Sequence, residues 1–161
     1  MTEPTALPLF SCRCPCGASA AQIAGRPLGR FFCHCTICQA VYQQTYADVT
    51  VFWGSAVQLP EPCNLQFRRY RLPPALRRGT CPVCHAPVLG FLRLAPFMQL
   101  AFVPTRNLLQ RAALPDPAMH IFYHRHVAEV SDGLPKIAGY WQSELAVTRL
   151  VMSGLSHPAQ R

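Results

Sequence analysis

The most constraining feature of this sequence is the placement of its nine cysteines, most of which fall into three tight clusters. Residues 11–17 read SCRCPCG, residues 33–38 read CHCTIC and residues 81–84 read CPVC, while Cys63 stands alone. Nine is an odd number, so complete disulfide pairing within one chain is impossible. Clustered thiols of this kind are typical of metal ligands when the chain carries no secretory signal.

The pair Cys81 and Cys84 is spaced to bind one metal ion from a tight turn whose backbone amides point at the sulfur atoms. The position after such a pair often needs a positive φ, which glycine adopts most easily. His85 occupies this position, and histidine tolerates that region better than most residues do. Two cysteines cannot complete a tetrahedral zinc site, so a second pair must come from elsewhere in the chain.

The second pair is expected in the first cluster, where Cys14 and Cys16 precede Gly17, another residue that permits a sharp turn. Cys12 could replace Cys14, and spacing alone does not choose between them. A four-cysteine zinc site would tie the N-terminal segment to the middle of the chain and close a long loop. The alternative is that these cysteines are buried or free thiols.

The middle cluster places Cys33, Cys35 and Cys38 where all three can face one metal ion, if a strand ends and a helical turn begins at the second of them. Three thiolates leave one tetrahedral position for water or substrate, which is typical of catalytic zinc. His34 should point to the opposite side of an extended segment, so it is a poor fourth ligand. The candidates for a more distant fourth ligand, which would close the site, are Cys63, His85 and His120.

Composition favours a mainly β fold, because 16 prolines and 9 glycines are spread along the chain and indicate many turns between short segments. The formal net charge of +8 comes almost wholly from arginine and is consistent with an acidic partner. Residues 1–10 contain neither a basic region nor a long apolar run, so a cytoplasmic location is expected. The most apolar window, residues 86–103, contains Arg93 and is expected to form two buried strands and no membrane span.

The chain is expected to form one domain over residues 11–151, with a lead-in at residues 1–10 and a tail at residues 152–161. Segments rich in Val, Thr and aromatic residues predict strands, and apolar spacing near the C-terminus predicts a helix. The expected strands are residues 18–24, 30–34, 46–53, 57–59, 65–69 and 120–123, with a hairpin within residues 86–103, and the expected helical segments are residues 36–42 and 140–152.

These motifs together resemble the glutathione-dependent formaldehyde-activating enzyme family, the domain group that includes centromere protein V. The resemblance rests on the order and spacing of seven cysteines across most of the chain. The matching stretches, which span residues 11–137, are SCRCPCGAS, FFCHCTIC, RRGTCPVCHAPV, LPDPAMHIFYHRH and VSDGLPKI.

The resemblance implies a mainly β, Mss4-like fold of folded β-sheets (a β-tent) with zinc-binding turns and short helices. The implied activity is that of a carbon–sulfur lyase, the condensation of formaldehyde with glutathione to S-hydroxymethylglutathione. A small thiol such as glutathione is then the expected partner, and nucleic acid is not. The implied ligands are Cys14, Cys16, Cys81 and Cys84 for a structural zinc, and Cys33, Cys35 and Cys38 for a second, catalytic zinc.

Departures from the family pattern bear on the substrate. The family usually continues the middle cluster with Arg-Lys and then a glycine followed by Ser or Ala, whereas this chain has Gln39-Ala40 and Gln43-Gln44. The glycine usual after the CxxC pair is replaced by His85. Loss of the positive charges predicts a different substrate, or binding of the same one through other arginines.

Two alternatives to an enzyme remain. A non-catalytic zinc-binding module could bind an anionic partner through the arginine-rich segment at residues 68–78 (RRYRLPPALRR), although such a segment is equally an exposed edge strand guarded by charge. The surplus thiols, Cys12 and Cys63, could instead serve a redox or zinc-buffering role.

Several other conspicuous side chains are expected to be structural. His120 lies on an apolar segment and is expected to be a hydrogen-bonded core histidine, and Asp132 is expected to bend a turn. The residues expected in the core are Phe31, Phe32, Trp53 and Trp141, of which the two phenylalanines could also wall the zinc pocket together with Tyr46.

Overall fold

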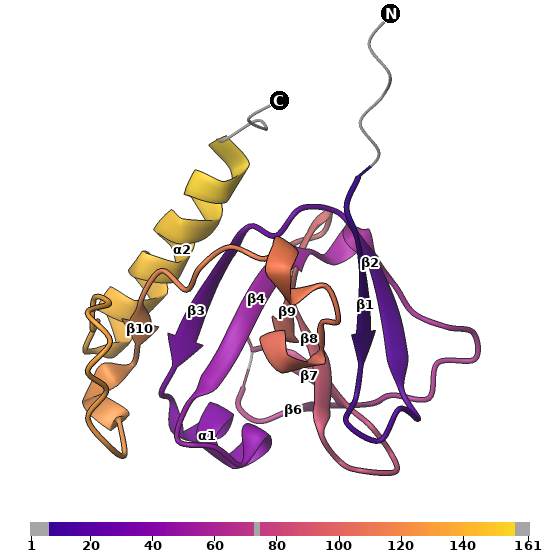
Figure 1. The fold of residues 1–161 in the computed structure, drawn as a ribbon, viewed down its shortest axis with the longest axis horizontal. Helices are drawn as coiled ribbons and strands as arrows, with labels where there is room; N and C mark the ends of the chain where they lie inside the picture. Colours follow the sequence, from indigo (N-terminus) through magenta and orange to yellow (C-terminus); the bar gives the residue numbers. More distant parts are fainter. Residues whose placement is uncertain (1–6, 73–74, 157–161) are drawn as a thin grey trace, which may run out of the picture.

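A computed structural model describes residues 7–72 and 75–156, which form two β-sheets and two α-helices (Figure 1). The expected mainly β, Mss4-like fold is confirmed. The elements are β1 (Leu9–Arg13), β2 (Ala20–Ala24), β3 (Gly29–Cys33), α1 (Thr36–Tyr42), β4 (Ala47–Trp53), β5 (Val57–Gln58), β6 (Gln66–Arg69), β7 (Arg77–Thr80), β8 (Pro87–Ala95), β9 (Met98–Pro104), β10 (His120–Ile121) and α2 (Tyr140–Ser156).

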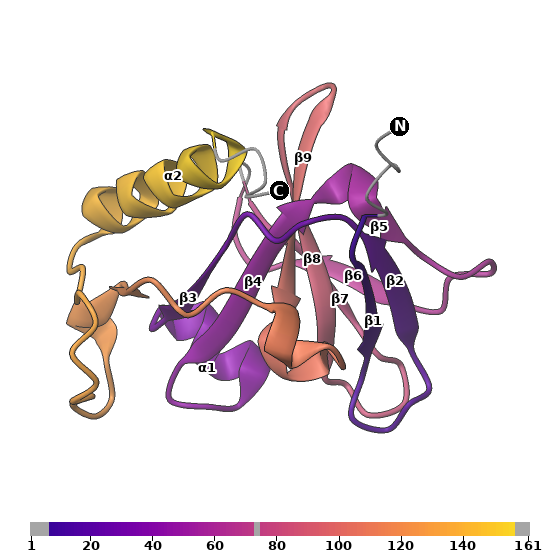
Figure 2. The same ribbon diagram turned by 45° about the horizontal axis from the view of Figure 1, so that its top comes forward.

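The strands are arranged in a small and a large sheet. The small sheet has the order β1-β2-β5, and the large sheet has the order β10-β3-β4-β9-β8-β7-β6. All pairings are antiparallel except that of β10 with β3. The hairpin of β8 and β9 projects past the other strands, with α2 on one side of the body and β1–β2 on the other (Figure 2).

Alternating residues of the central strands pack into two separate cores, one on each face of the large sheet. On β4, Phe52 belongs to the core shared with β1 and β2, whereas its neighbours Val51 and Trp53 belong to the core beneath α2. On β9, Ala101 packs into the core shared with β1 and β2, and Phe102 packs into the core beneath α2. This is the period-two alternation of a sheet buried on both faces.

The observed elements follow the predicted ones closely, although α2 runs to Ser156, into the expected tail, and three further expectations differ. Strand β1 begins at Leu9, so the buried Phe10 belongs to a strand and not to the expected lead-in. Strand β7 was not predicted, because its sequence RRGT carries no apolar alternation. The expectation that Trp141 is a core residue is wrong, because its side chain is 78% exposed on α2.

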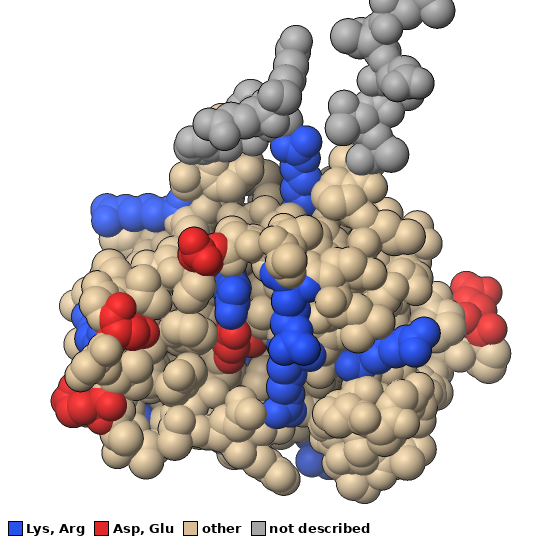
Figure 3. All heavy atoms as spheres, viewed as in Figure 1, with Lys and Arg blue, Asp and Glu red and all other residues tan. Residues whose placement is uncertain are grey.

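The apolar window at residues 86–103 forms the two expected strands, β8 and β9, but it is not buried throughout, because Leu94, Phe97 and Met98 around the hairpin turn are exposed. Within the described part of the chain, no helix has the length and apolar character needed to cross a lipid bilayer. Lysine and arginine side chains are interspersed with uncharged residues on the face shown in Figure 3, and they do not form one continuous basic patch there.

Helix α2 lies against the segment before β3 through Gly154, whose Cα faces the backbone carbonyl of Leu28. A Gly→Ala change inside a helix ordinarily adds about 0.5–1 kcal/mol of stability. Here the new methyl group would meet backbone that cannot rotate away, so Gly154→Ala should lower the free energy of unfolding by about 1–3 kcal/mol in urea denaturation. Arg149→Ala, an exposed change on the same helix, should stay within about 0.5 kcal/mol of the parent. A stabilised Gly154→Ala protein would contradict this packing of α2.

Candidate metal centres and the adjoining pocket

A first group of four cysteines joins the two sheets. Cys14 and Cys16 lie in the turn between β1 and β2, and Cys81 and Cys84 lie in the turn between β7 and β8. All four sulfur atoms lie within 4.8 Å of one another, and the Sγ atoms of Cys16 and Cys81 are 3.7 Å apart. Ligands placed about 2.3 Å from a tetrahedral zinc ion are about 3.8 Å apart, so this group can hold a metal ion.

Both turns of the four-cysteine group have the backbone geometry that the sequence predicts. Gly17 has φ +77° and His85 has φ 58°, so each turn ends in the left-handed region. The amide of Ser19 donates to the Sγ of Cys14 at 3.2 Å, and the amide of Val83 donates to the Sγ of Cys81 at 3.4 Å. Amides aimed at sulfur stabilise the thiolate form that a metal ion requires.

Cys12 and Cys63 lie outside both cysteine groups. The thiol of Cys12 is fully buried and donates to the carbonyl oxygen of Val88 at 3.5 Å, and burial raises its pKa to about 12. A thiol held neutral in the core is a poor ligand, so the geometry favours Cys14 over Cys12. Cys63 is exposed on a loop.

A second group consists of three cysteines at the junction of β3 and α1, where Cys33 ends the strand and Cys38 lies in the first helical turn. Cys35 caps the helix, and its Sγ accepts from the amide of Cys38 at 3.3 Å. The three sulfur atoms lie within 4.8 Å of one another. Among the described residues, no fourth Cys, His, Asp or Glu joins this group, so the suggested distant ligands Cys63, His85 and His120 do not close it.

Negative charge within this group concentrates on Cys35. Hydrogen bonds from the thiols of Cys33 and Cys38 lower the pKa of Cys35, and the amide of Cys38 acts in the same direction. Half-buried Arg78, on β7, donates from Nη2 to the Sγ of Cys38 at 3.4 Å. Its guanidinium therefore supplies positive charge beside a cluster that becomes strongly anionic when all three thiols ionise.

Gln39 replaces an arginine of the family pattern and has a structural role. Its side-chain Nε2 donates to the carbonyl oxygens of His34 at 2.7 Å and of Arg125 at 2.8 Å. These bonds tie α1 to the short 3₁₀ helix at Tyr123–Arg125, which forms part of the rim of the pocket described below. Gln43 adopts φ 51° at the end of α1, the conformation for which the family's glycine is suited.

A chain of hydrogen bonds runs from the surface residue Asp132 to two buried histidines beside the three-cysteine group. Asp132 Oδ2 lies 2.6 Å from His120 Nε2, and His120 Nδ1 lies 2.8 Å from His34 Nε2. Because the carboxylate can only accept, we assign the proton to His120 Nε2, which makes its Nδ1 an acceptor from His34. His34 Nδ1 is then an unprotonated, buried nitrogen for which the described residues provide no partner. Burial, and then the nearby His120 ring, lowers the pKa of His34 to about 4, so the His34 ring is neutral at pH 7.

The three-cysteine group opens into a pocket of about 590 Å³ between the large sheet and α2. Its walls come from β4, β8, β9 and α2, and are mostly apolar. Phe31 lines this pocket, but Phe32 and Tyr46 do not, because their rings stack around His34 and His120. The charged side chains along the pocket are Arg71, Arg78, Arg125 and Glu144.

The sequence matches the family described as glutathione-dependent formaldehyde-activating enzyme over residues 9–125. The chain belongs to this family. The matched segment runs from the start of β1 to the short helix Tyr123–Arg125, so it includes both cysteine groups but not α2. No curated protein matches the chain.

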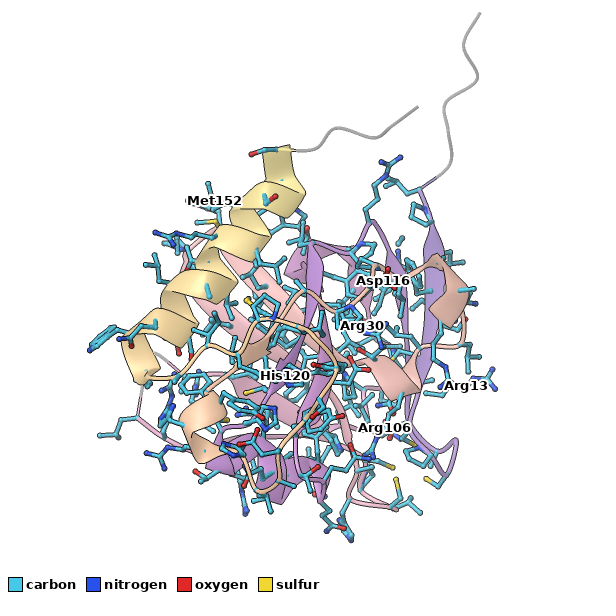
Figure 4. The ribbon with its side chains drawn as sticks, turned by 60° about the vertical axis from the view of Figure 1, so that its left-hand side comes forward. Arg13, Arg30, Arg106, Asp116, His120 and Met152 are labelled. Carbon is cyan, nitrogen blue, oxygen red and sulfur yellow. The ribbon has the colours of Figure 1, made fainter. Side chains whose placement is uncertain are left out.

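Sequence reasoning missed two residues of this site. Asp132 was expected only to bend a turn, yet it also holds His120, which lies inside the molecule (Figure 4). Arg78 was part of the arginine-rich segment, and only the strand register shows that it faces the cysteines while Arg77 faces away from them. The role of Asp132 could have been predicted, because a buried histidine such as His120 needs a hydrogen-bond acceptor. No local sequence pattern indicates the direction in which Arg78 points.

Asp132→Asn should destabilise the protein, because it removes a charged acceptor from the fully buried His120 and a partner from Lys136. We expect the urea concentration at the midpoint of unfolding to fall measurably, because a buried histidine loses its charged acceptor. Asp116→Asn, an exposed change on the preceding loop, is the matched control and should stay within about 0.5 kcal/mol.

The stabilisation that Asp132 provides should decrease at low pH. The hydrogen bond from Lys136, and then that from His120, holds the pKa of Asp132 well below its usual value of 3.8. The stabilisation of the folded state by ionised Asp132 is therefore complete above pH 3.8 and is lost as the pH falls further. Equal stability of Asp132→Asn and the parent at pH 7 would contradict the assigned role.

Proposed function

We propose that this protein catalyses the reversible addition of a thiol to formaldehyde, as the family's name indicates, at a zinc ion held by Cys33, Cys35 and Cys38. The observation that carries the proposal is a group of three cysteines, without a fourth ligand among the described residues, that opens into a pocket. Closed four-ligand sites are structural, whereas three-ligand sites accept a further group. The remaining group, Cys14, Cys16, Cys81 and Cys84, would hold a structural zinc.

Three thiolates around zinc supply a particular chemistry: an electron-rich ion polarises a carbonyl weakly but binds a soft substrate thiol as its thiolate. The chain's own contribution is to hold the three sulfur atoms together and to balance their charge. Arg78 places its guanidinium on Cys38, and the amide of Cys38 donates to Cys35. These contacts offset part of the negative charge of the three thiolates, so that the substrate thiolate can still approach.

The proposed step balances without an oxidant or reductant. The S–H bond of the thiol breaks, a C–S bond forms to the carbonyl carbon of formaldehyde, and the carbonyl oxygen takes up a proton. The reverse step breaks the C–S bond, which is carbon–sulfur lyase chemistry. Glutathione is the thiol named by the family, and the cytoplasm, where thiols stay reduced, is the expected location.

A second candidate is a non-catalytic zinc module that binds an anionic partner. It is favoured by Arg69, Arg77 and Arg93, which line a separate hollow on the opposite face of the β6–β8 segment from the cysteine pocket. Arg69 and Arg77 are direct cross-strand neighbours, and within the described residues no carboxylate pairs with any of the three. Like charges on directly opposite residues repel one another, and a bound anion would reduce this repulsion.

The two candidate functions can be distinguished by replacing Arg78, which faces the cysteine pocket, and its neighbour Arg77, which faces the other side of the sheet. For an enzyme, zinc-loaded protein should accelerate formation of the glutathione–formaldehyde adduct, followed by NMR exchange spectroscopy. Cys35→Ser should return the rate to the uncatalysed value, and Arg78→Met should lower it at least about tenfold, the effect of losing one charge-assisted hydrogen bond of 1.5–3 kcal/mol. Arg77→Met and Cys63→Ser are the matched controls and should leave the rate unchanged.

Acceleration that survives in Cys35→Ser would contradict the proposed site. No acceleration by the parent, together with heparin binding that weakens steeply with salt and is lost in Arg77→Met, would favour the non-catalytic module.

A further inference from the structure

We infer that the thiol accepted at the three-cysteine site carries a large apolar group, in place of the polar tripeptide glutathione. This inference rests on the proposed function, because it names the substrate class of the same site.

The pocket is large and its walls are apolar. Its volume of about 590 Å³ lies within the range of cavities that bind small molecules. Formaldehyde needs only a small fraction of this space, so most of it is available to the thiol. The apolar walls nearest the sheet and α2 are formed by Trp53, Leu92, Leu100, Phe102, Val147 and Val151.

Most polar groups along the pocket are already engaged with one another. The hydroxyl of Thr148 donates to the carbonyl oxygen of Glu144 on its own helix at 2.9 Å. The hydroxyl of Tyr140 accepts from Arg71 at 2.7 Å, and the same guanidinium lies 3.9 Å from the carboxylate of Glu144. Arg78 is committed to Cys38.

Glutathione fits such a pocket poorly. It carries two carboxylates, an ammonium group and two peptide units, and each polar group that is buried without a partner costs about 1–3 kcal/mol. An alkyl or aromatic thiol has no such groups. Removing its apolar surface from water would instead favour binding.

The apolar wall on one side of the pocket comes from α2, which lies outside the family-matched residues 9–125. Val147, Val151, Met152 and Leu155 all line the pocket from this helix, on which Met152 is labelled in Figure 4. The cysteines that define the chemistry thus come from the segment shared with the family. The surface that selects the thiol comes in part from a helix beyond it.

The test measures binding of neutral ω-mercaptoalkanols with two, four, six and eight carbons, and of glutathione, to the zinc-loaded protein. Trp53 lines the pocket and reports binding by fluorescence once the exposed Trp141, the second of the two tryptophans, is replaced in a Trp141→Phe background. Each added methylene should tighten binding about fourfold, the effect of burying one CH₂ group. The eight-carbon thiol should bind more tightly than glutathione.

A polar replacement in the pocket gives the matched comparison. Met98→Gln with Met152→Gln changes two partly exposed pocket residues at nearly constant volume, and should reduce the gain per methylene. Leu109→Gln, an equally exposed residue outside the pocket, should leave it unchanged.

Two outcomes would overturn the inference, and they can be told apart. If all mercaptoalkanols bind equally, or glutathione binds most tightly and its adduct forms faster, the apolar substrate is excluded while the proposed addition reaction stands. If no thiol binds and none is turned over, the proposed function fails together with the inference.

Discussion

The contact on which the rest of this structure depends is the meeting of two cysteine turns at Cys14–Cys16 and Cys81–Cys84. One turn belongs to the small sheet and the other to the large sheet, and 65 residues separate Cys16 from Cys81. A metal ion bound by both turns would cross-link the chain, and by the chain-entropy relation a loop of this length would destabilise the unfolded state by about 4 kcal/mol. The four-cysteine group also lies directly before β8, which together with β9 forms one wall of the pocket.

Residues around the second cysteine group offset the negative charge that its three cysteines carry when they ionise. Three thiolates repel one another, and Arg78 from β7 and the N-terminal turn of α1 bring positive charge and amide dipoles to them. Behind the group, His34 is held by His120, which is held in turn by Asp132, and His34 itself adds no charge because its pKa is lowered to about 4. The three cysteines line the apolar pocket and have no fourth metal-ligating residue beside them among the described residues.

Local spacing allowed much of this site to be predicted, because a CxxC turn and its left-handed last residue are properties of a few consecutive residues. The positive φ of His85 and the helix beginning after Cys35 are examples. The side of the sheet that Arg78 faces depends on the register of three strands, and the partner of His120 lies 12 residues away in another loop. Trp141 was misplaced because the helix pattern alone does not show which face is covered.

The central claim is that one chain holds two metal ions in sites of different character. Its most direct test is elemental analysis of metal per chain in the purified protein, in Cys35→Ser and in Cys63→Ser as the control. The account predicts two zinc ions in the parent and in Cys63→Ser, and one in Cys35→Ser with the fold intact by circular dichroism. A single zinc ion per chain in all three proteins would contradict it, because the three-cysteine group would then hold no metal.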